Sequence, residues 1–295
     1  MRNLHDNPYS KTATFGLLVC SLIWGATFVI VKISVETVDP LSFVFGRFTI
    51  AFIVLAAFSW KDLRVNWRSH LPTSALLGIV LFAGFILQVF GLERTSSSNA
   101  GFITGLSVVL VAVLDVVVNK RLPTILALLG FLSALSGLLI LSIGESHITS
   151  FGNILVFGCA VAFGLHVFWT DKYSKRLNVK VLTTEQIGIV VLISLIGTIL
   201  NGRPISNPST YAFFGIIYTG VLATALAYFL QTWSQKHANA MHSAVVLSAE
   251  PVFAAAFAVL LISEPVTNQL VVGGLLVIIG ALLSSLCRKN SMSNT

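Results

Sequence analysis

The chain has 295 residues, of which 56% are hydrophobic and only 10% are charged, whereas about 25% of the residues of a typical soluble domain are charged. A soluble protein could not bury that much apolar surface, so the composition predicts an all-α integral membrane protein with many spans. The net charge of +7 does not indicate a nucleic-acid partner, because the basic residues gather in alternate connections between spans.

Ten apolar segments follow one another, most of them long enough to cross a bilayer as one helix. Prolines stand at or near the segment ends, where they disturb a helix least. The connections are short, and none could hold a soluble domain. The predicted spans are residues 13–33, 41–59, 71–92, 97–118, 122–143, 151–170, 184–200, 209–232, 240–262 and 266–287, of which the seventh is the shortest.

The basic residues predict the orientation of these spans. If the N-terminus is cytoplasmic, 14 of the 18 Lys and Arg residues fall in cytoplasmic segments, so both termini are predicted to be cytoplasmic. The cytoplasmic set is Arg2, Lys11, Lys61, Arg64, Arg68, Lys120, Arg121, Lys172, Lys175, Arg176, Lys180, Lys236, Arg288 and Lys289. The others are Lys32, Arg94 and Arg203 outside and Arg47 within a span.

The two halves of the chain align without a gap at an offset of 143 residues, so that Gln88 matches Gln231 and Gly137 matches Gly280. The third, fourth and fifth spans match the eighth, ninth and tenth, while the first and sixth match poorly. Because each half has an odd number of spans, the second half enters the membrane inverted, as in many secondary transporters. The predicted repeats are residues 13–143 and 151–287.

Three short motifs stand within the predicted spans. They are Trp24-Gly25-x-x-Phe28 in the first span, Arg47 in the second and Glu250-Pro251 in the ninth. With the ten spans and the two repeats, these motifs make residues 13–286 resemble the EamA-type permeases of the drug/metabolite transporter superfamily. The resemblance implies an inner-membrane carrier, often an exporter of amino acids or other small metabolites. It also implies a central cavity lined by helices 1–4 and 6–9, with helices 5 and 10 at the periphery.

Two positions depart from the pattern of that family. Many first repeats have a proline where this chain has Val108, and an acidic residue near the end of the fourth span where it has Lys120-Arg121. These departures weaken the expectation that the fourth and ninth spans kink symmetrically, but they leave the expected fold unchanged.

The ninth span holds Glu250 and Pro251 among small apolar residues. A charge at that depth costs roughly 3 kcal/mol or more, so it faces protein or a water-filled cavity. Pro251 has no N–H, so the carbonyl of Leu247 loses its partner and the helix is predicted to kink there. Two interpretations stay open: a structural kink with a protonated or hydrogen-bonded Glu250, or a role of Glu250 in the transport path or its gating.

Other polar residues within spans allow two interpretations each. Arg47 is either an anchor for a substrate carboxylate or a cation held by backbone carbonyls or the interface. Gln88 and Gln231 either join helices or contact substrate. Trp24 lies too deep for the interfacial aromatic belt, so it either lines a cavity or packs against neighbouring helices. The substrate-path candidates are Trp24, Phe28, Arg47, Gln88, Tyr228, Gln231 and Glu250, with Phe85 and Phe253 as further aromatic candidates.

The remaining ionisable residues have weaker functional signals. His166 lies toward the cytoplasmic side of the sixth span, where it either packs or forms a proton relay with Glu250. Asp115 is expected to pair locally at the cytoplasmic end of the fourth span, and Glu185 to stand at the start of the seventh. The fifth and tenth spans contain glycines at seven-residue spacing, which indicate packing or dimer faces, so the chain is predicted to be a monomer or a homodimer.

Motifs typical of nucleotide-driven pumps and of hydrolytic enzymes are missing from the sequence. GxxxxGK[ST], GxSxG and HExxH are absent, so neither nucleotide hydrolysis nor an enzyme active site is predicted. Cys20, Cys159 and Cys287 show no metal-ligand spacing and are interpreted as packing residues, so no metal or cofactor is expected.

A channel is a weaker hypothesis, because a pore would need several polar rings and this chain offers only isolated polar residues within its spans. A secondary carrier, with the bilayer and a small metabolite such as an amino acid as partners, is the leading hypothesis. A multidrug or hydrophobic-cation exporter is the alternative.

Overall fold

The computed structural model of the chain describes residues 8–95, 97–120, 125–141, 151–202, 208–262 and 266–286. All regular secondary structure in these ranges is helical, which confirms the all-α prediction. The helices are α1 (Pro8–Ser34), α2 (Pro40–Leu92), α3 (Ser97–Gly105), α4 (Ser107–Asn119), α5 (Ile125–Leu141), α6 (Phe151–Ser174), α7 (Val179–Asn201), α8 (Thr210–Gly220), the π-helix η1 (Val221–Leu226), α9 (Ala227–His237), α10 (Ala240–Leu247), α11 (Glu250–Ile262) and α12 (Asn268–Leu286). The predicted positions of Arg2, Arg121, Arg203, Cys287, Arg288 and Lys289 lie outside the described residues.

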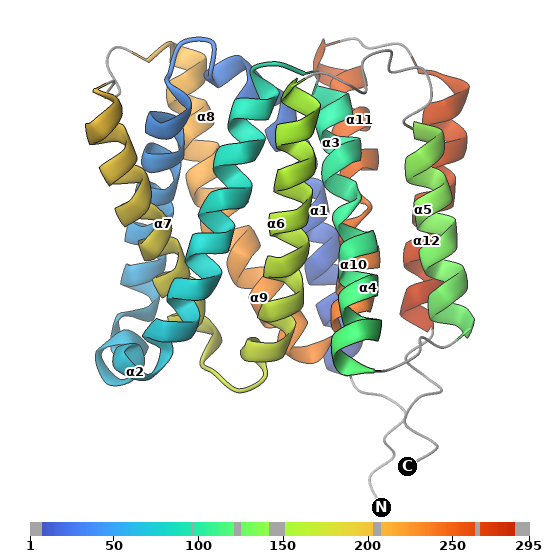
Figure 1. Ribbon diagram of the computed structural model, residues 1–295, viewed down its shortest axis with the longest axis horizontal. Helices are drawn as coiled ribbons and strands as arrows, with labels where there is room; N and C mark the ends of the chain where they lie inside the picture. The colour runs from blue at the N-terminus through green and yellow to red at the C-terminus, as the bar shows by residue number, and fades with distance from the viewer. Residues whose placement is uncertain are drawn as a thin grey trace, which may run out of the picture.

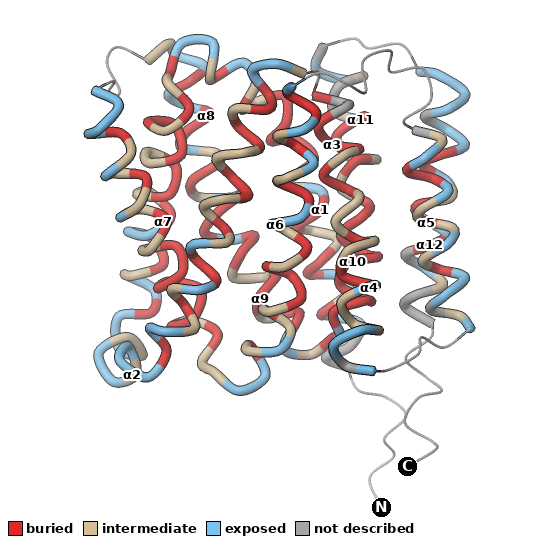
Figure 2. Tube along the Cα trace, in the orientation of Figure 1, coloured by how far each residue is buried: buried red, intermediate tan, exposed pale blue. Residues whose placement is uncertain are grey.

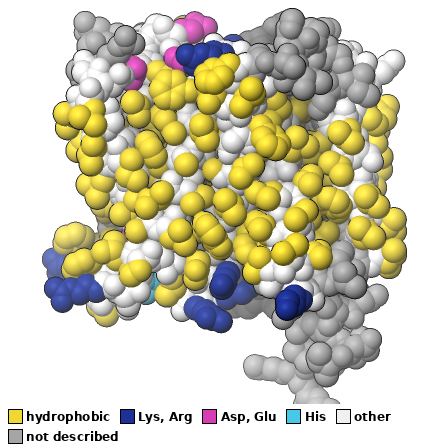
Figure 3. Space-filling view, in the orientation of Figure 1, with side chains coloured by type: hydrophobic (Ala, Val, Ile, Leu, Met, Phe, Trp, Pro, Cys, Tyr) yellow, Lys and Arg dark blue, Asp and Glu magenta, His cyan; other side chains and the backbone are white. Residues whose placement is uncertain are grey.

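Seven helical stretches in the described part of the chain are long and apolar enough to cross a membrane, and two shorter apolar stretches lie in α5 and α12. The helices stand side by side as a bundle (Figure 1). Their inward sides are buried, while the outward sides of α5 and α12 are largely exposed (Figure 2). Exposed hydrophobic side chains cover the bundle between two rims, and Lys and Arg gather along the lower rim (Figure 3). The chain is therefore a multi-pass membrane protein.

Helix α2 folds back on itself. It has 53 residues, so a straight helix of this length would extend about 80 Å. A Cβ added to Gly188 of α7 would lie 2.9 Å from the Phe52 ring, and one added to Gly78 would lie 2.7 Å from Ile189. Phe52 and Gly78 thus lie beside neighbouring residues of α7, although a straight helix would place them about 39 Å apart. The second and third predicted spans are the two arms of α2, joined by helical residues at the lower end in Figure 1.

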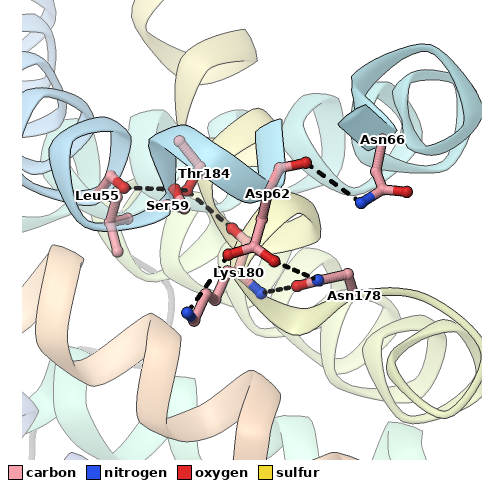
Figure 4. A network of polar contacts seen from close by, with 7 residues as sticks. All are labelled: Leu55, Ser59, Asp62, Asn66, Asn178, Lys180 and Thr184. Carbon is pink, nitrogen blue, oxygen red and sulfur yellow. Dashed lines mark hydrogen bonds and ion pairs between the residues drawn. The ribbon is translucent and has the colours of Figure 1, made fainter. Parts of the chain in front are cut away.

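Polar contacts attach the fold-back of α2 to the start of α7 (Figure 4). Asp62 accepts a hydrogen bond from the Asn178 amide at 3.0 Å, and its other oxygen lies 3.3 Å from Lys180 Nζ. His70 Nε2 accepts from the Asn178 backbone N–H at 2.9 Å. Asn178 also caps α7, accepting from the backbone N–H of Lys180. These contacts fix the direction in which α7 enters the bundle.

The seventh predicted span begins too late in the chain. Helix α7 begins at Val179, directly after its N-cap residue Asn178, and has 23 residues. The prediction that this span is the shortest is therefore wrong. Glu185 lies in the second turn of the helix, where it is buried, and not at the helix start.

Two predicted spans are broken at matching places. Helices α3 and α4 replace the fourth predicted span, and α10 and α11 replace the ninth. The break before Pro251 follows from its missing N–H. The departure at Val108, which stands where the second half has Pro251, does not prevent a break in the first half, because the helix is also interrupted at Leu106. The two breaks lie against each other, since a Cβ added to Gly105 would lie 3.0 Å from Pro251 Cγ.

The regularly spaced glycines pack α5 against α12 within the chain. A Cβ added to Gly137 would lie 2.5 Å from the carbonyl oxygen of Gly273, and one added to Gly280 would lie 2.6 Å from that of Gly130. The Ser133 hydroxyl donates to the carbonyl of Leu276 at 2.8 Å between the same two helices. The absence of side chains therefore lets the backbones touch. Of the predicted glycines, Gly144 lies outside the described residues.

Replacing Gly137 with Val should lower the free energy of unfolding by about 1–3 kcal/mol, because the new atoms meet backbone that cannot move aside. A lower apparent melting temperature in detergent would measure this loss. Gly158→Ala is the matched control, since its Cβ would meet only the flexible end of Leu87 at 3.2 Å. Equal melting of the Gly137→Val variant and the parent would contradict the close packing of α5 and α12.

Candidate functional site

A small cavity lies inside the bundle, between α1, α2, α6, α9 and the two broken spans. Its volume is about 50 Å³, which holds roughly three to five water molecules at about 10–15 Å³ each. A solute the size of an amino acid therefore enters only if the lining side chains move. No described residue of α5 or α12 lines the cavity. Six of the seven substrate-path candidates do: Trp24, Arg47, Gln88, Tyr228, Gln231 and Glu250.

Arg47 is a cation held inside the bundle that forms no ion pair with a carboxylate in the described segments. Only 1% of its surface is exposed, and its Nε and Nη2 donate to Thr224 Oγ1 at 3.1 and 2.9 Å. Its guanidinium carbon lies 4.6 Å from the centre of the Phe85 ring, a cation–π distance. Nη1 makes no hydrogen bond to any residue that the structure describes. The guanidinium therefore keeps donors available at the cavity wall.

The π-helix η1 is held by two of these candidates. Trp24 Nε1 donates to the carbonyl of Ala223 at 2.7 Å, and Arg47 binds the hydroxyl of Thr224. Both partners belong to η1, and π-helical turns displace backbone groups from the regular hydrogen-bond ladder, often at functional sites. The Trp24 ring also lies 5.1 Å from the Tyr228 ring. The first two spans are thus coupled to the segment that precedes the cavity-lining residues of α9.

Glu250 opens helix α11 and faces the same cavity. A carboxylate in the first turn of a helix is favoured by the partial positive charge of that end. Within the described part of the chain its carboxylate makes no hydrogen bond and no ion pair, either to the turn around Pro251 or to Arg47. Glu250 is therefore available to a ligand or a proton.

His166 and the two glutamines complete the polar wall of the cavity. His166 Nε2 bonds Gln186 Oε1 at 2.8 Å, and its ring lies 5.8 Å from that of Tyr228. No direct hydrogen bond between described residues joins His166 to Glu250, so the proton relay stays a prediction. Gln231 is 1% exposed, and its Oε1 has no hydrogen-bond partner among the described residues. This amide oxygen is a ready acceptor for a ligand.

Three aromatic positions differ from the sequence prediction. Phe28 is 2% exposed and packs in the core, away from the cavity lining. Phe253 packs against Gly25 in place of lining the cavity. Phe163 was not predicted, yet it lines the cavity and its ring lies 5.2 Å from that of Phe85. The pair Phe163-Gly164 repeats the pair Trp24-Gly25, a short signal in the poorly matching spans.

Comparisons with known proteins agree with this architecture. The model of the EamA-like transporter family matches residues 11–143 and 150–286. An uncharacterized transporter of Archaeoglobus fulgidus is 31% identical over 276 residues, covering 93% of this chain and 86% of that protein. Protein PagO of Salmonella typhimurium is 24% identical over 93% of this chain and 96% of its own length. One crystal structure shares the fold, with a TM-score of 0.77 and 19% identity over 94% of this chain and 97% of the other. The chain therefore belongs to the EamA-like transporter family of the drug/metabolite transporter superfamily.

Proposed function

We propose that the protein is a secondary carrier that exports zwitterionic small metabolites, such as amino acids, across the cytoplasmic membrane by alternating access. One observation carries the proposal: the same cavity is lined by Glu250 and Arg47, and among the described residues neither the Glu250 carboxylate nor Arg47 Nη1 has a partner. A zwitterion offers a carboxylate to the guanidinium and an ammonium to Glu250 and to Gln231 Oε1. Aromatic rings around these groups suit a moderately apolar side chain.

Reciprocal aromatic contacts support two inverted repeats. Trp24 packs on Tyr228 at 5.1 Å, and Phe163 packs on Phe85 at 5.2 Å. Tyr228 is the counterpart of Phe85 at the 143-residue offset, and Phe163 is the counterpart of Trp24 through the shared Trp/Phe-Gly pair. Exchanging the two halves of the chain therefore turns one contact into the other, which is the pattern that a two-fold axis produces. Phe85 and Tyr228 themselves lie 6.0 Å apart, as expected beside such an axis.

The packing of α5 against α12 repeats this pattern. Gly137 meets Gly273 while Gly130 meets Gly280, and both glycines of one half are offset by 143 residues from those of the other. The hydrogen bond from Ser133 to Leu276 joins residues that differ by the same 143. We infer a pseudo-two-fold axis in the membrane plane, with the repeats at residues 13–143 and 151–287 and ten membrane crossings in total.

The proposed orientation places both termini in the cytoplasm. Reporter fusions after Arg68, Lys120 and Lys180 should give cytoplasmic signals, and a fusion at Gly144 should give an external one, because the basic residues concentrate at one rim. The measurement is the paired activity of a cytoplasmic and an external reporter at each site. A cytoplasmic signal at Gly144 would contradict both the orientation and the inverted second repeat.

A competition assay in proteoliposomes tests the substrate class. A hydrophobic amino acid should compete for transport, whereas its methyl ester, which keeps only the ammonium, and its N-acetyl derivative, which keeps only the carboxylate, should each compete at least tenfold more weakly. If the ester and simple hydrophobic amines compete better than the amino acid, the protein is a hydrophobic-cation exporter and the zwitterion proposal is wrong. Flux without saturation or counterflow would identify a channel.

A further inference from the structure

A second cavity opens at the basic end of the bundle, apart from the central one. It has a volume of about 680 Å³ and lies where the connection between α6 and α7 approaches the end of α9. The described residues that line it include four basic side chains and no acidic one. The basic residues are Arg176, Lys180, Lys236 and His237.

Two of these cations are not neutralised within the described part of the chain. Lys180 lies 3.3 Å from Asp62, as the close-up of the junction between α2 and α7 shows (Figure 4). By contrast, no described carboxylate lies within 4.0 Å of the cationic nitrogens of Arg176 or Lys236, and both residues are exposed. Unpaired cations on one concave surface reinforce each other and attract an anion.

The cavity also has an apolar side that reaches the outer surface of the bundle. Phe229 and Trp233 of α9 line it. The Phe229 ring lies 5.5 Å from that of Phe58, which is 57% exposed and belongs to a membrane-spanning stretch of α2. Lys180 Nζ lies 4.9 Å from the centre of the Phe58 ring. Lys180, at the edge of the cavity, therefore stands directly beside an exposed aromatic ring of a membrane-spanning stretch.

We propose that this cavity binds one anionic phospholipid of the adjacent leaflet, with its phosphate on Arg176 and Lys236 and its first acyl carbons on Phe58, Phe229 and Trp233. Juxtamembrane cations attract acidic headgroups, and aromatic rings suit the boundary between headgroups and hydrocarbon. A soluble anion would use the cations alone, whereas the Phe229 and Trp233 side chains in the lining, with the exposed Phe58 ring next to Phe229 and Lys180, favour a ligand with an apolar part. The occupied site would hold the α6–α7 connection against α9.

Lipid titration of the purified protein in detergent, followed by its melting temperature, tests the proposal. Phosphatidylglycerol should raise the melting temperature at low lipid concentration, and phosphatidylcholine should not. The Arg176→Gln/Lys236→Gln variant should need about 30-fold more phosphatidylglycerol for the same shift, because each of the two cations contributes about 1 kcal/mol to the binding of an acidic lipid. Trp233→Ala, which keeps the cations, should also weaken the response.

The matched control is Arg64→Gln/Arg68→Gln, which removes the same charge from residues stacked on Trp60 and Trp67 outside the cavity. This control should respond to phosphatidylglycerol as the parent does. If both double variants lose the same part of the melting-temperature shift, the shift depends only on the net charge of the protein, and the proposal is overturned. An equal shift with inorganic phosphate alone would make the cavity a site for a soluble anion and would equally overturn it.

Discussion

Replacing Arg47 with Ala should lower the apparent affinity for a zwitterionic substrate by about 30- to 1000-fold, which corresponds to about 2–4 kcal/mol. In the proposed complex the Arg47 guanidinium at the cavity wall binds the substrate carboxylate, so its removal would leave that carboxylate buried without this partner. The variant should still fold, because Thr224 keeps its own hydrogen bond to the Thr219 carbonyl at 2.7 Å. The measurement is the concentration dependence of uptake into proteoliposomes.

Two further variants separate charge from position at Arg47. Arg47→Lys keeps the charge but loses the planar fork, so it should recover only part of the affinity. Thr224→Val removes the hydrogen-bond partner of Nε and Nη2 and leaves the guanidinium in place. It should cost less than Arg47→Ala. An Arg47→Ala variant that folds and transports with unchanged affinity would remove this residue from the substrate site.

Replacing Glu250 with Gln should leave folding intact and abolish the pH dependence of transport, with a loss of affinity of about 10- to 100-fold. Gln keeps the shape of the side chain but neither the charge nor the titration. In the parent, a proton and a substrate ammonium compete for one carboxylate, so affinity should fall as the pH is lowered. In Glu250→Gln this dependence should disappear. The measurement is the apparent affinity in proteoliposomes across a range of pH.

If Glu250 has only a structural role, the opposite result is expected for Glu250→Gln. A carboxylate that only holds the kink would tolerate Gln with unchanged affinity and pH dependence, while Ala would lower stability. The structure favours the ligand role, because the side chain makes no hydrogen bond to the broken turn among the described residues. Parent-like transport by Glu250→Gln and Glu250→Ala at every pH would exclude both roles.

The helical architecture could be predicted because the bilayer imposes a length and a composition on each span. The two α2 arms, the glycine contacts between α5 and α12, and the break before Pro251 all follow from local residue properties. Six of seven path candidates reach one cavity for a related reason, since polar groups inside a membrane protein must face protein or water.

Other features depend on contacts between distant segments. The break at Leu106 has no proline at the position that matches Pro251, and it lies where Gly105 packs against the ring of Pro251 from another helix. The π-helix η1 takes its side-chain partners from α1 and α2, so the residues of η1 itself do not predict it. Phe28 has the same chemistry as Phe163, yet only Phe163 faces the cavity. Both side chains point into the bundle, and a short motif does not specify which of them reaches the cavity.

Cysteine accessibility tests alternating access at the central cavity most directly. Single cysteines at Gln88 and Gln231, in an otherwise cysteine-free protein, report the two matched positions at the cavity wall. Each should react with a membrane-impermeant thiol reagent added to either side of the membrane, because the cavity of a carrier opens to the two sides in turn. Saturating substrate should slow both reactions. Labelling from one side only, or labelling that substrate does not change, would contradict a carrier with its substrate site in this cavity.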